Sequence, residues 1–397
     1  MAVQLCLSSY VRSVNAALSL LRKINLIVKS EVLVLACDVS GGDVKSAPSA
    51  AFFKDLEQRC PNLRRLHLSK VDVTAPLPAS LEFLSLSESS LSPTALSAFL
   101  FDAGEGQTVT SRLREVELVS VELRRSAMAA VPSSVERLRI RDTELPRESF
   151  EGLAGGQATV SRLKEIDLSD NTRLTDVEID NITSAWPHIN TLKLNGCVNT
   201  TFPSFTVFLH IVQSLGQGGR LEILEANGVQ FTYENIRYMC THLGGSLRRL
   251  SVAGCKVPGG LTDVANLPNL RSLDVSGSGC SIMFGGVGYV LEALEANGLP
   301  LADVHIRIIC QNLAPTLRRL GIARCWLTKS GATTIASTMT NLQSLDISGC
   351  PALDDADFMV FASLGETLHF LNLSATKVSK DTVDLLKVAL PNCEIVH

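Results

Sequence analysis

The feature that most constrains this chain is a short hydrophobic motif that recurs along most of its length. The pattern L-x-x-L-x-L, with conservative replacements, occurs thirteen times between Leu63 and Leu368, with a mean spacing near 25. Self-similarity at such a period indicates a stack of short supersecondary units rather than several independent domains. The copies begin at Leu63, Leu81, Leu113, Val135, Leu163, Ile189, Leu221, Leu247, Leu270, Leu291, Leu317, Leu342 and Leu368.

Each repeat predicts a strand, a turn and a helix. Because side chains of a strand alternate between its two sides, positions 4 and 6, counted from the first leucine, should be buried, and positions 3 and 5 should face outward. The segment 233–243 then shows an i, i+3, i+4, i+7 apolar stripe that predicts a helix. This stripe consists of Ile236, Met239, Cys240 and Leu243, and it recurs further along the chain as Ile306, Ile309, Cys310 and Leu313. Half-repeats at Leu33 and Leu35, and at Leu390, Cys393 and Ile395, predict a strand at each end of the array.

Two further strings recur, and the two copies of each are separated along the chain by the same number of residues as the two copies of this apolar stripe. The string LEILEANG, which begins at Leu221, returns as LEALEANG at Leu291, and the LRRL that begins at Leu247 returns at Leu317. This offset is longer than a single repeat, so we infer that a block of several repeats was duplicated.

A cysteine at position 9 narrows the type of repeat. It occurs at Cys197, Cys255, Cys325 and Cys350, and the string LDISGCP from Leu345 is followed by LDD. Over residues 60–397 the chain therefore resembles the cysteine-containing leucine-rich repeats of the F-box/leucine-rich-repeat family. The resemblance implies an α/β ribonuclease-inhibitor-like horseshoe with a parallel concave sheet and convex helices. It also implies substrate recognition in ubiquitin ligation, as a ligase adaptor, although no F-box is recognisable.

The first thirty residues allow two interpretations. They contain no Asp or Glu, but they contain Arg12, Arg22, Lys23 and Lys29, a composition typical of a mitochondrial transit segment. The alternative is an amphipathic helix over about residues 9–22 that caps the array. We expect residues 1–30 to form this helix or cap and residues 31–397 to form a single solenoid. The expected compartment is intracellular, either cytoplasmic or nuclear, with a mitochondrial alternative.

Composition and motif content argue against several function classes. A net charge of −4 and a pI near 6.0 are unlike those of a strongly basic nucleic-acid binder, and no apolar run is long enough to span a bilayer. The eleven cysteines form no CxxC pair, so buried free thiols are expected. Phosphate-binding loops, dinucleotide fingerprints, HExxH and GxSxG are not found, and the seven histidines lack metal-ligand spacing. The sequence therefore predicts a protein that is not an enzyme and has no cofactor or metal.

The concave face is the expected binding surface. Between Glu117 and Lys193 the charge at position 5 alternates in sign from repeat to repeat, so neighbouring charges can neutralise one another. The second half carries acidic residues at position 5 that lack a basic counterpart there, and the face offers few apolar anchors. The predicted binding residues are the acidic Glu225, Asp274, Glu295 and Asp346 and the apolar Phe83, Ile223 and Phe370.

These observations predict a scaffold that binds a protein partner carrying a basic segment. Two alternatives remain open from sequence. The chain could be a structural subunit of a larger assembly, mitochondrial if the first segment is a presequence, or a GTPase-activating protein. The sequence does not indicate the oligomeric state.

Overall fold

The structure of the chain is a computed structural model. It describes residues 32–36, 50–99, 112–146, 149, 162–199, 211–213, 215, 221–257, 267–280 and 290–397. The segment 1–31, with the expected helix over residues 9–22, lies outside these residues. The chain divides into two compact units, Met1–Asn199 and Thr200–His397, and each unit is considered by itself. The expected single solenoid over residues 31–397 stays a prediction.

The first unit is built on seven parallel strands in the order β1-β2-β4-β6-β8-β9-β10. Their bounds are β1 Val32–Ala36, β2 Arg65–Ser69, β4 Phe83–Ser87, β6 Glu115–Val119, β8 Arg137–Arg141, β9 Glu165–Asp167 and β10 Thr191–Lys193. A second, three-stranded sheet joins β3 Asp72–Val73, β5 Ser90–Leu91 and β7 Glu122–Leu123. The helical segments are α2 Ala50–Arg59, the 3₁₀ helix η1 Pro93–Phe99 and α3 Asp176–Ala185.

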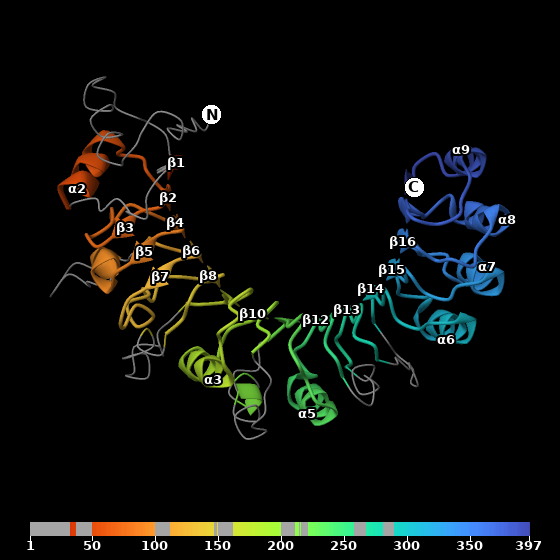
Figure 1. Ribbon diagram of the computed structural model, residues 1–397, viewed down its shortest axis with the longest axis horizontal. Helices are drawn as coiled ribbons and strands as arrows, with labels where there is room; N and C mark the ends of the chain where they lie inside the picture. The colour runs from red at the N-terminus through yellow and green to blue at the C-terminus, as the bar shows by residue number, and fades with distance from the viewer. Residues whose placement is uncertain are drawn as a thin grey trace. The chain divides into compact units, whose positions relative to one another are not determined.

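The second unit carries eight parallel strands that follow one another in chain order. They are β11 Ile223–Glu225, β12 Arg249–Ser251, β13 Ser272–Asp274, β14 Ala293–Glu295, β15 Arg319–Gly321, β16 Ser344–Asp346, β17 Phe370–Asn372 and β18 Glu394–Val396. Its helices are α5 Tyr233–Leu243, α6 Asp303–Leu313, α7 Lys329–Thr338, α8 Asp355–Phe358, the 3₁₀ helix η5 Met359–Leu364 and α9 Lys380–Ala389. All of these helices lie on the same side of the strands (Figure 1). We call the opposite side of the strands, in either unit, the open face.

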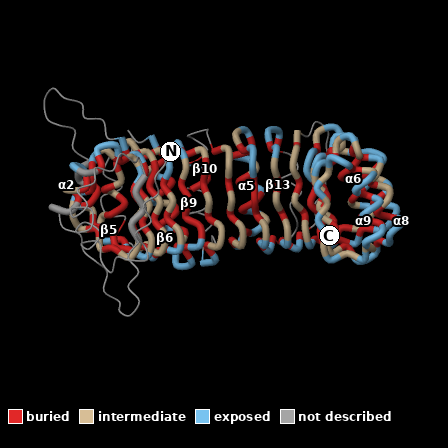
Figure 2. Tube along the Cα trace, turned by 90° about the horizontal axis from the view of Figure 1, so that it is seen from above, coloured by how far each residue is buried: buried red, intermediate tan, exposed pale blue. Residues whose placement is uncertain are grey.

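The burial pattern confirms the predicted alternation. In β2, Leu66 and Leu68 are buried while Arg65 is exposed, and in β14 Leu294 is buried between two half-buried residues. Figure 2 shows the same arrangement, with buried residues along the middle of the tube and exposed residues along its edges. The core of each unit is thus a continuous stack of leucine-type side chains, which no single repeat could bury alone.

Helix α5 matches the predicted range, and the sequence explains how it begins. The Thr232 side chain accepts a hydrogen bond from the Asn235 backbone N–H, and the Asn235 side chain accepts one from the Thr232 backbone N–H, which closes a capping box. Ile236, Met239 and Leu243 are buried, while Cys240 is half-buried. The duplicated helix α6 buries all four members of its stripe.

The repeats are also joined by polar contacts next to the sheet. The Asn227 side chain accepts a hydrogen bond from the Ala253 backbone N–H at 2.8 Å, and Asn297, its equivalent in the duplicated block, accepts one from the Ala323 backbone N–H at 2.7 Å. The position-9 thiols bridge neighbouring repeats in the same way, with Cys255 Sγ donating to the Ala226 carbonyl at 3.1 Å. These contacts hold successive strands in register and present position 5 to the open face.

Candidate protein-binding face

Position 5 of the second unit forms a row of polar side chains on the open face. The strand register aligns Glu225 with Ser251 and then Asp274, and it aligns Asp274 with Glu295. The row continues through Gly321, Asp346 and Asn372. Each of the predicted acidic residues is half-buried, because it stands on a sheet between neighbouring strands.

The aspartates of this row also hold the ends of their own strands. Asp274 Oδ1 accepts the Ser276 backbone N–H at 3.0 Å, and Asp346 Oδ1 accepts the Ser348 backbone N–H at 2.9 Å. This two-residue turn is a local structural use of an Asp side chain. It fixes the two carboxylates in place on the open face.

Glu295 occupies a gap that Gly321 leaves open on the next strand. A Cβ added at Gly321 would lie 1.8 Å from Glu295 Oε2, so the carboxyl lies where a side chain would otherwise stand. The Asn297 side-chain amide donates to Glu295 Oε2 at 3.1 Å. Burial raises the pKa of the Glu295 carboxyl, and the charges of Asp274 and Asp346 raise it further, against the opposing effects of Asn297 and Arg319.

Arginines at position 3 modify the predicted acidic row. Arg249 Nε lies 3.2 Å from Glu225 Oε1, so Glu225, for which no basic counterpart was expected at position 5, has a basic neighbour at position 3 of the next strand. That expectation considered only the residues at position 5 of neighbouring strands. An arginine at position 3 of the next strand is long enough to reach a position-5 carboxylate diagonally. Arg319 likewise acts on Glu295 from position 3. The centre of the acidic row is therefore Asp274, Glu295 and Asp346.

The three apolar candidates do not form one patch. Ile223 on β11 and Phe370 on β17 are half-buried at position 3, close to opposite ends of the unit. Phe83 belongs to the first unit and is only 6% exposed, because the Arg65 guanidinium carbon lies 4.6 Å from its ring centroid and the His67 ring lies 4.9 Å from it. The expectation of an accessible anchor at Phe83 is therefore wrong.

The open face of the first unit carries a network of ion pairs, which we call the arginine ladder. Its members are Arg137, Arg139 and Arg141 on β8, Glu115 on β6, and Glu165 and Asp167 on β9. The predicted neutralisation takes place diagonally, since Arg139 contacts Glu115 at 2.6 Å and Glu165 at 3.4 Å while its in-register neighbours are Glu117 and Asp167.

Both buried acids of the arginine ladder are held in the charged form. Burial alone would raise the pKa of Glu115, but the hydrogen bond and charge of Arg137, aided by Arg139, lower it below its ordinary value. Burial opposes ionisation of Asp167 too, and hydrogen bonds from Arg141 and Ser169 lower its pKa.

The position-9 cysteines are structural. Cys197, Cys255, Cys325 and Cys350 are all fully buried free thiols, as predicted. Burial raises the pKa of Cys197 and of Cys255 to about 12, so neither thiol is a nucleophile near neutral pH. Within the described part of the chain, no group of three or more His, Cys, Asp or Glu side chains could hold a metal ion.

Comparison with known proteins agrees with this geometry. Residues 338–362 match the family model described as a leucine-rich repeat. An internalin from Listeria monocytogenes strain 4b F2365 superposes with a TM-score of 0.53 at 15% identity, covering 86% of this chain and 88% of the internalin. The fold is a leucine-rich-repeat solenoid.

A further leucine-rich-repeat structure, the TLR13–ssRNA13 complex, matches with a TM-score of 0.45 and 15% identity, covering 92% of this chain and 56% of that one. No curated protein sequence matches the chain. Leucine-rich repeats usually serve as binding scaffolds, so the open face of the sheet is the surface to consider. None of the described helices combines the length and apolar character needed to cross a bilayer.

Proposed function

We propose that this leucine-rich-repeat chain is a non-enzymatic scaffold and that the open face of its second unit binds a basic segment of a partner protein. The observation that carries the proposal is the strand register, which places Asp274 beside Glu295 and Asp346 one strand beyond Gly321 on the open face. The state of Glu295 supports it. Its pKa is raised by burial and by two neighbouring aspartates, so the ionised row is held together against its own repulsion. A Lys or Arg side chain placed over this row would relieve that repulsion.

The positions of the arginines restrict where the partner lies. Arg249 already pairs with Glu225, and Arg319 stands at position 3 of β15, before the acidic row. Both would repel a cation near the beginning of the strands. The basic segment is therefore expected over Asp274, Glu295 and Asp346 at position 5, with Ile223 and Phe370 as apolar contacts at the two ends.

The test uses the full chain and a partner identified by affinity purification at low salt. The variant Glu295→Gln/Asp346→Asn should weaken binding of the purified partner about tenfold or more and reduce the salt dependence of the affinity. Glu117→Gln, which removes a position-5 carboxylate from the first unit, is the matched control and should leave the affinity unchanged. An affinity that is the same for all three proteins would contradict the proposal.

Within this function, the finer proposal is substrate recognition in ubiquitin ligation. It is supported by the position-9 cysteines, which resemble those of the F-box/leucine-rich-repeat family. Recovery of a cullin adaptor with the tagged endogenous protein would support it. Recovery of a fixed set of organellar subunits would instead favour a structural role, and stimulated GTP hydrolysis by a small GTPase would contradict both.

A further inference from the structure

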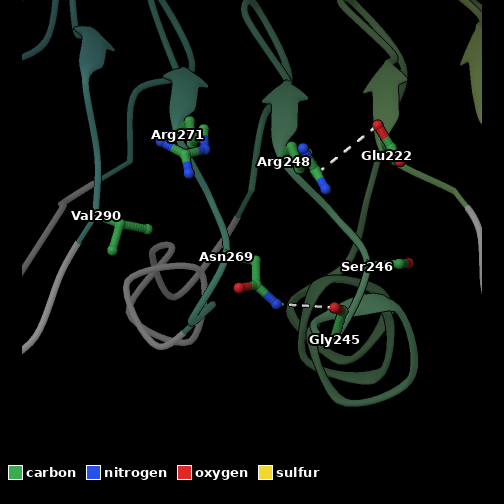
Figure 3. Close-up of a pocket in the computed structure, with 7 residues that line it drawn as sticks. All are labelled: Glu222, Gly245, Ser246, Arg248, Asn269, Arg271 and Val290. Carbon is green, nitrogen blue, oxygen red and sulfur yellow. Dashed lines mark hydrogen bonds and ion pairs between the residues drawn. The ribbon is translucent and has the colours of Figure 1, made fainter.

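A polar pocket of about 360 Å³ lies beside the C-terminal end of α5, where β11, β12 and β13 begin. It lies outside the acidic row, since its side chains come from position 2 and from the segments that lead into the strands. Figure 3 shows the residues that line the pocket. The Asn269 side chain donates a hydrogen bond to the Gly245 carbonyl at 2.9 Å. The side chains that line it include Glu222, Ser246, Arg248, Asn269, Arg271 and Val290.

The charges at position 2 follow an order that places two arginines side by side. Glu222, Arg248, Arg271 and Glu292 precede the neighbouring strands β11 to β14. Arg248 Nε lies 3.7 Å from Glu222 Oε2, and Arg271 pairs with Glu292 on the other side. Each guanidinium therefore has its carboxylate on the side away from the other arginine, and Glu222 also lines the pocket. Like charges on adjacent strands repel each other, and those of Arg248 and Arg271 do so across the pocket.

The duplicated block repeats the backbone frame of this pocket but changes two of the four charged residues at position 2, since Gln343 and His369 replace Arg271 and Glu292. Arg318 is the equivalent of Arg248 in the recurring LRRL string, and Asn341 donates to the Pro315 carbonyl at 3.2 Å as Asn269 does to Gly245. The backbone N–H of Gln343 donates to the Arg318 carbonyl at 2.8 Å, the same bond that Arg271 makes with Arg248. Gln343 thus stands where the first block has Arg271.

This internal comparison shows what the fold of a repeat can do without. The second block keeps the strand register, the asparagine contact and the acid before Arg318, but it replaces both Arg271 and its ion-pair partner Glu292, with Gln343 and His369. The fold of a repeat therefore requires neither member of this pair. Arg248 and Arg271 are also 59% and 55% exposed, which leaves their guanidinium donors accessible from solvent.

We propose that this pocket binds an oxyanion group, a phosphate or a carboxylate of a small molecule, between Arg248 and Arg271. A guanidinium offers a planar fork of donors that matches such groups, and two forks on adjacent strands can hold one anion from two sides. The volume suits a small ligand at the lower end of the usual range for such sites. This inference concerns a different surface from that of the partner-binding proposal and does not depend on it.

The test is isothermal titration calorimetry of the full chain at low ionic strength, with pyrophosphate in one arm and citrate in the other. We expect one site per chain for at least one of the two anions. Arg271→Gln, which reproduces the residue of the second block, should weaken that binding about tenfold or more. Arg318→Gln is the matched control and should leave it unchanged.

The reverse substitution provides a gain of binding. Gln343→Arg places a second arginine beside Arg318, so the stoichiometry should rise towards two. Thermal unfolding of each variant verifies that it is folded. Absence of binding in both arms would overturn the proposal, as would binding that Arg271→Gln does not weaken. The arm that responds to Arg271→Gln identifies the oxyanion as phosphate or carboxylate.

Discussion

Asp167 in the first unit and Glu295 in the second stand at the same position of the repeat, yet their pKa values move in opposite directions. Both side chains lose water to burial, so burial is not the difference. Asp167 has Arg141 Nε at 2.9 Å, whereas Glu295 has an amide donor and two acids near it. One repeat position can therefore give a closed ion-pair network or an unneutralised row, and the arginines of neighbouring strands decide which.

The largest loss of stability is expected from breaking the arginine ladder at its buried acid, Asp167. Asp167→Ala leaves the Arg141 guanidinium and the Ser169 backbone N–H without their acceptor. Because Asp167 is fully buried but Arg141 is 42% exposed, the loss should be about 2–3 kcal/mol of the free energy of unfolding. Urea denaturation measures it. A loss equal to that of Asp346→Ala, which removes one turn hydrogen bond, would contradict the comparison.

Neutralising one acid on each face should change the free energy of unfolding in opposite directions. At pH 7, Glu115→Gln should destabilise the chain by about 1–2 kcal/mol, because two charge-assisted hydrogen bonds are weakened at partly exposed arginines. Glu295→Gln should stabilise it by a few tenths of a kcal/mol up to about 1, since it removes a repelled charge in a partly screened site. Thermal unfolding of both variants tests the two signs. If both variants lost the same amount of stability, the two faces would not differ in this respect and the comparison would fail.

The pH dependence follows from the same pKa values. A raised pKa means that folded Glu295 binds its proton more tightly than the unfolded chain does. Its destabilising contribution should therefore fade as the pH drops from neutral through the raised pKa towards the ordinary value of 4.5. The lowered pKa of Glu115 has the opposite consequence, as its stabilisation persists above 4.5 and is lost only as the pH falls further. The gain from Glu295→Gln should thus disappear at about pH 4, whereas a gain that persists there would have another cause.

A smaller effect is expected from closing the gap beside Glu295. The added methyl of Gly321→Ala meets the end of a flexible side chain, so the carboxyl should move into solvent at a cost below about 1 kcal/mol. Its pKa should fall towards 4.5, which an NMR titration of the carboxyl can follow. An unchanged pKa would show that Asp274 and Asp346, rather than enclosure beside Gly321, set it.

The smallest effect should come from the Arg249–Glu225 pair. Arg249→Gln removes an ion pair in which the arginine is 54% exposed, so the change should be only about 0.2–1 kcal/mol. Binding of a basic partner should become slightly tighter, because the variant removes a positive charge beside the acidic row. Weaker binding would indicate that Arg249 contacts the partner directly.

The sequence predicted the strands of the main sheet, but not the second sheet of β3, β5 and β7 or the reach of the side chains. The leucine period predicts β11 to β17, the apolar stripe predicts α5, and position 9 predicts the buried thiols, since each depends only on which side of an element a residue occupies. Charge pairing depends on the length of the side chain as well. Arg249 reaches Glu225 from position 3, and Arg65 covers Phe83, so neither outcome followed from position 5 alone.

The pocket at Arg248 and Arg271 was also missed, although its signal was present. The duplicated LRRL string shows what the two blocks share. The positions that indicate the pocket are those at which the charges of the two blocks differ. Aligning position 2 of the two blocks would have shown Arg271 opposite Gln343 and Glu292 opposite His369. Which residues line the pocket still required coordinates, because Gly245 and Val290 come from segments outside the motif.

The buried position-9 thiols can report where and how often each unit opens locally. Cys197 Sγ donates to the Leu168 carbonyl and Cys255 Sγ to the Ala226 carbonyl, both at 3.1 Å and both across a boundary between repeats. An alkylating reagent can reach such a sulfur, and find it as thiolate, only while that boundary is open. The labelling rate of each cysteine therefore counts the opening events at one known place along the stack, so a wild-type chain already carries probes for where the solenoid first comes apart.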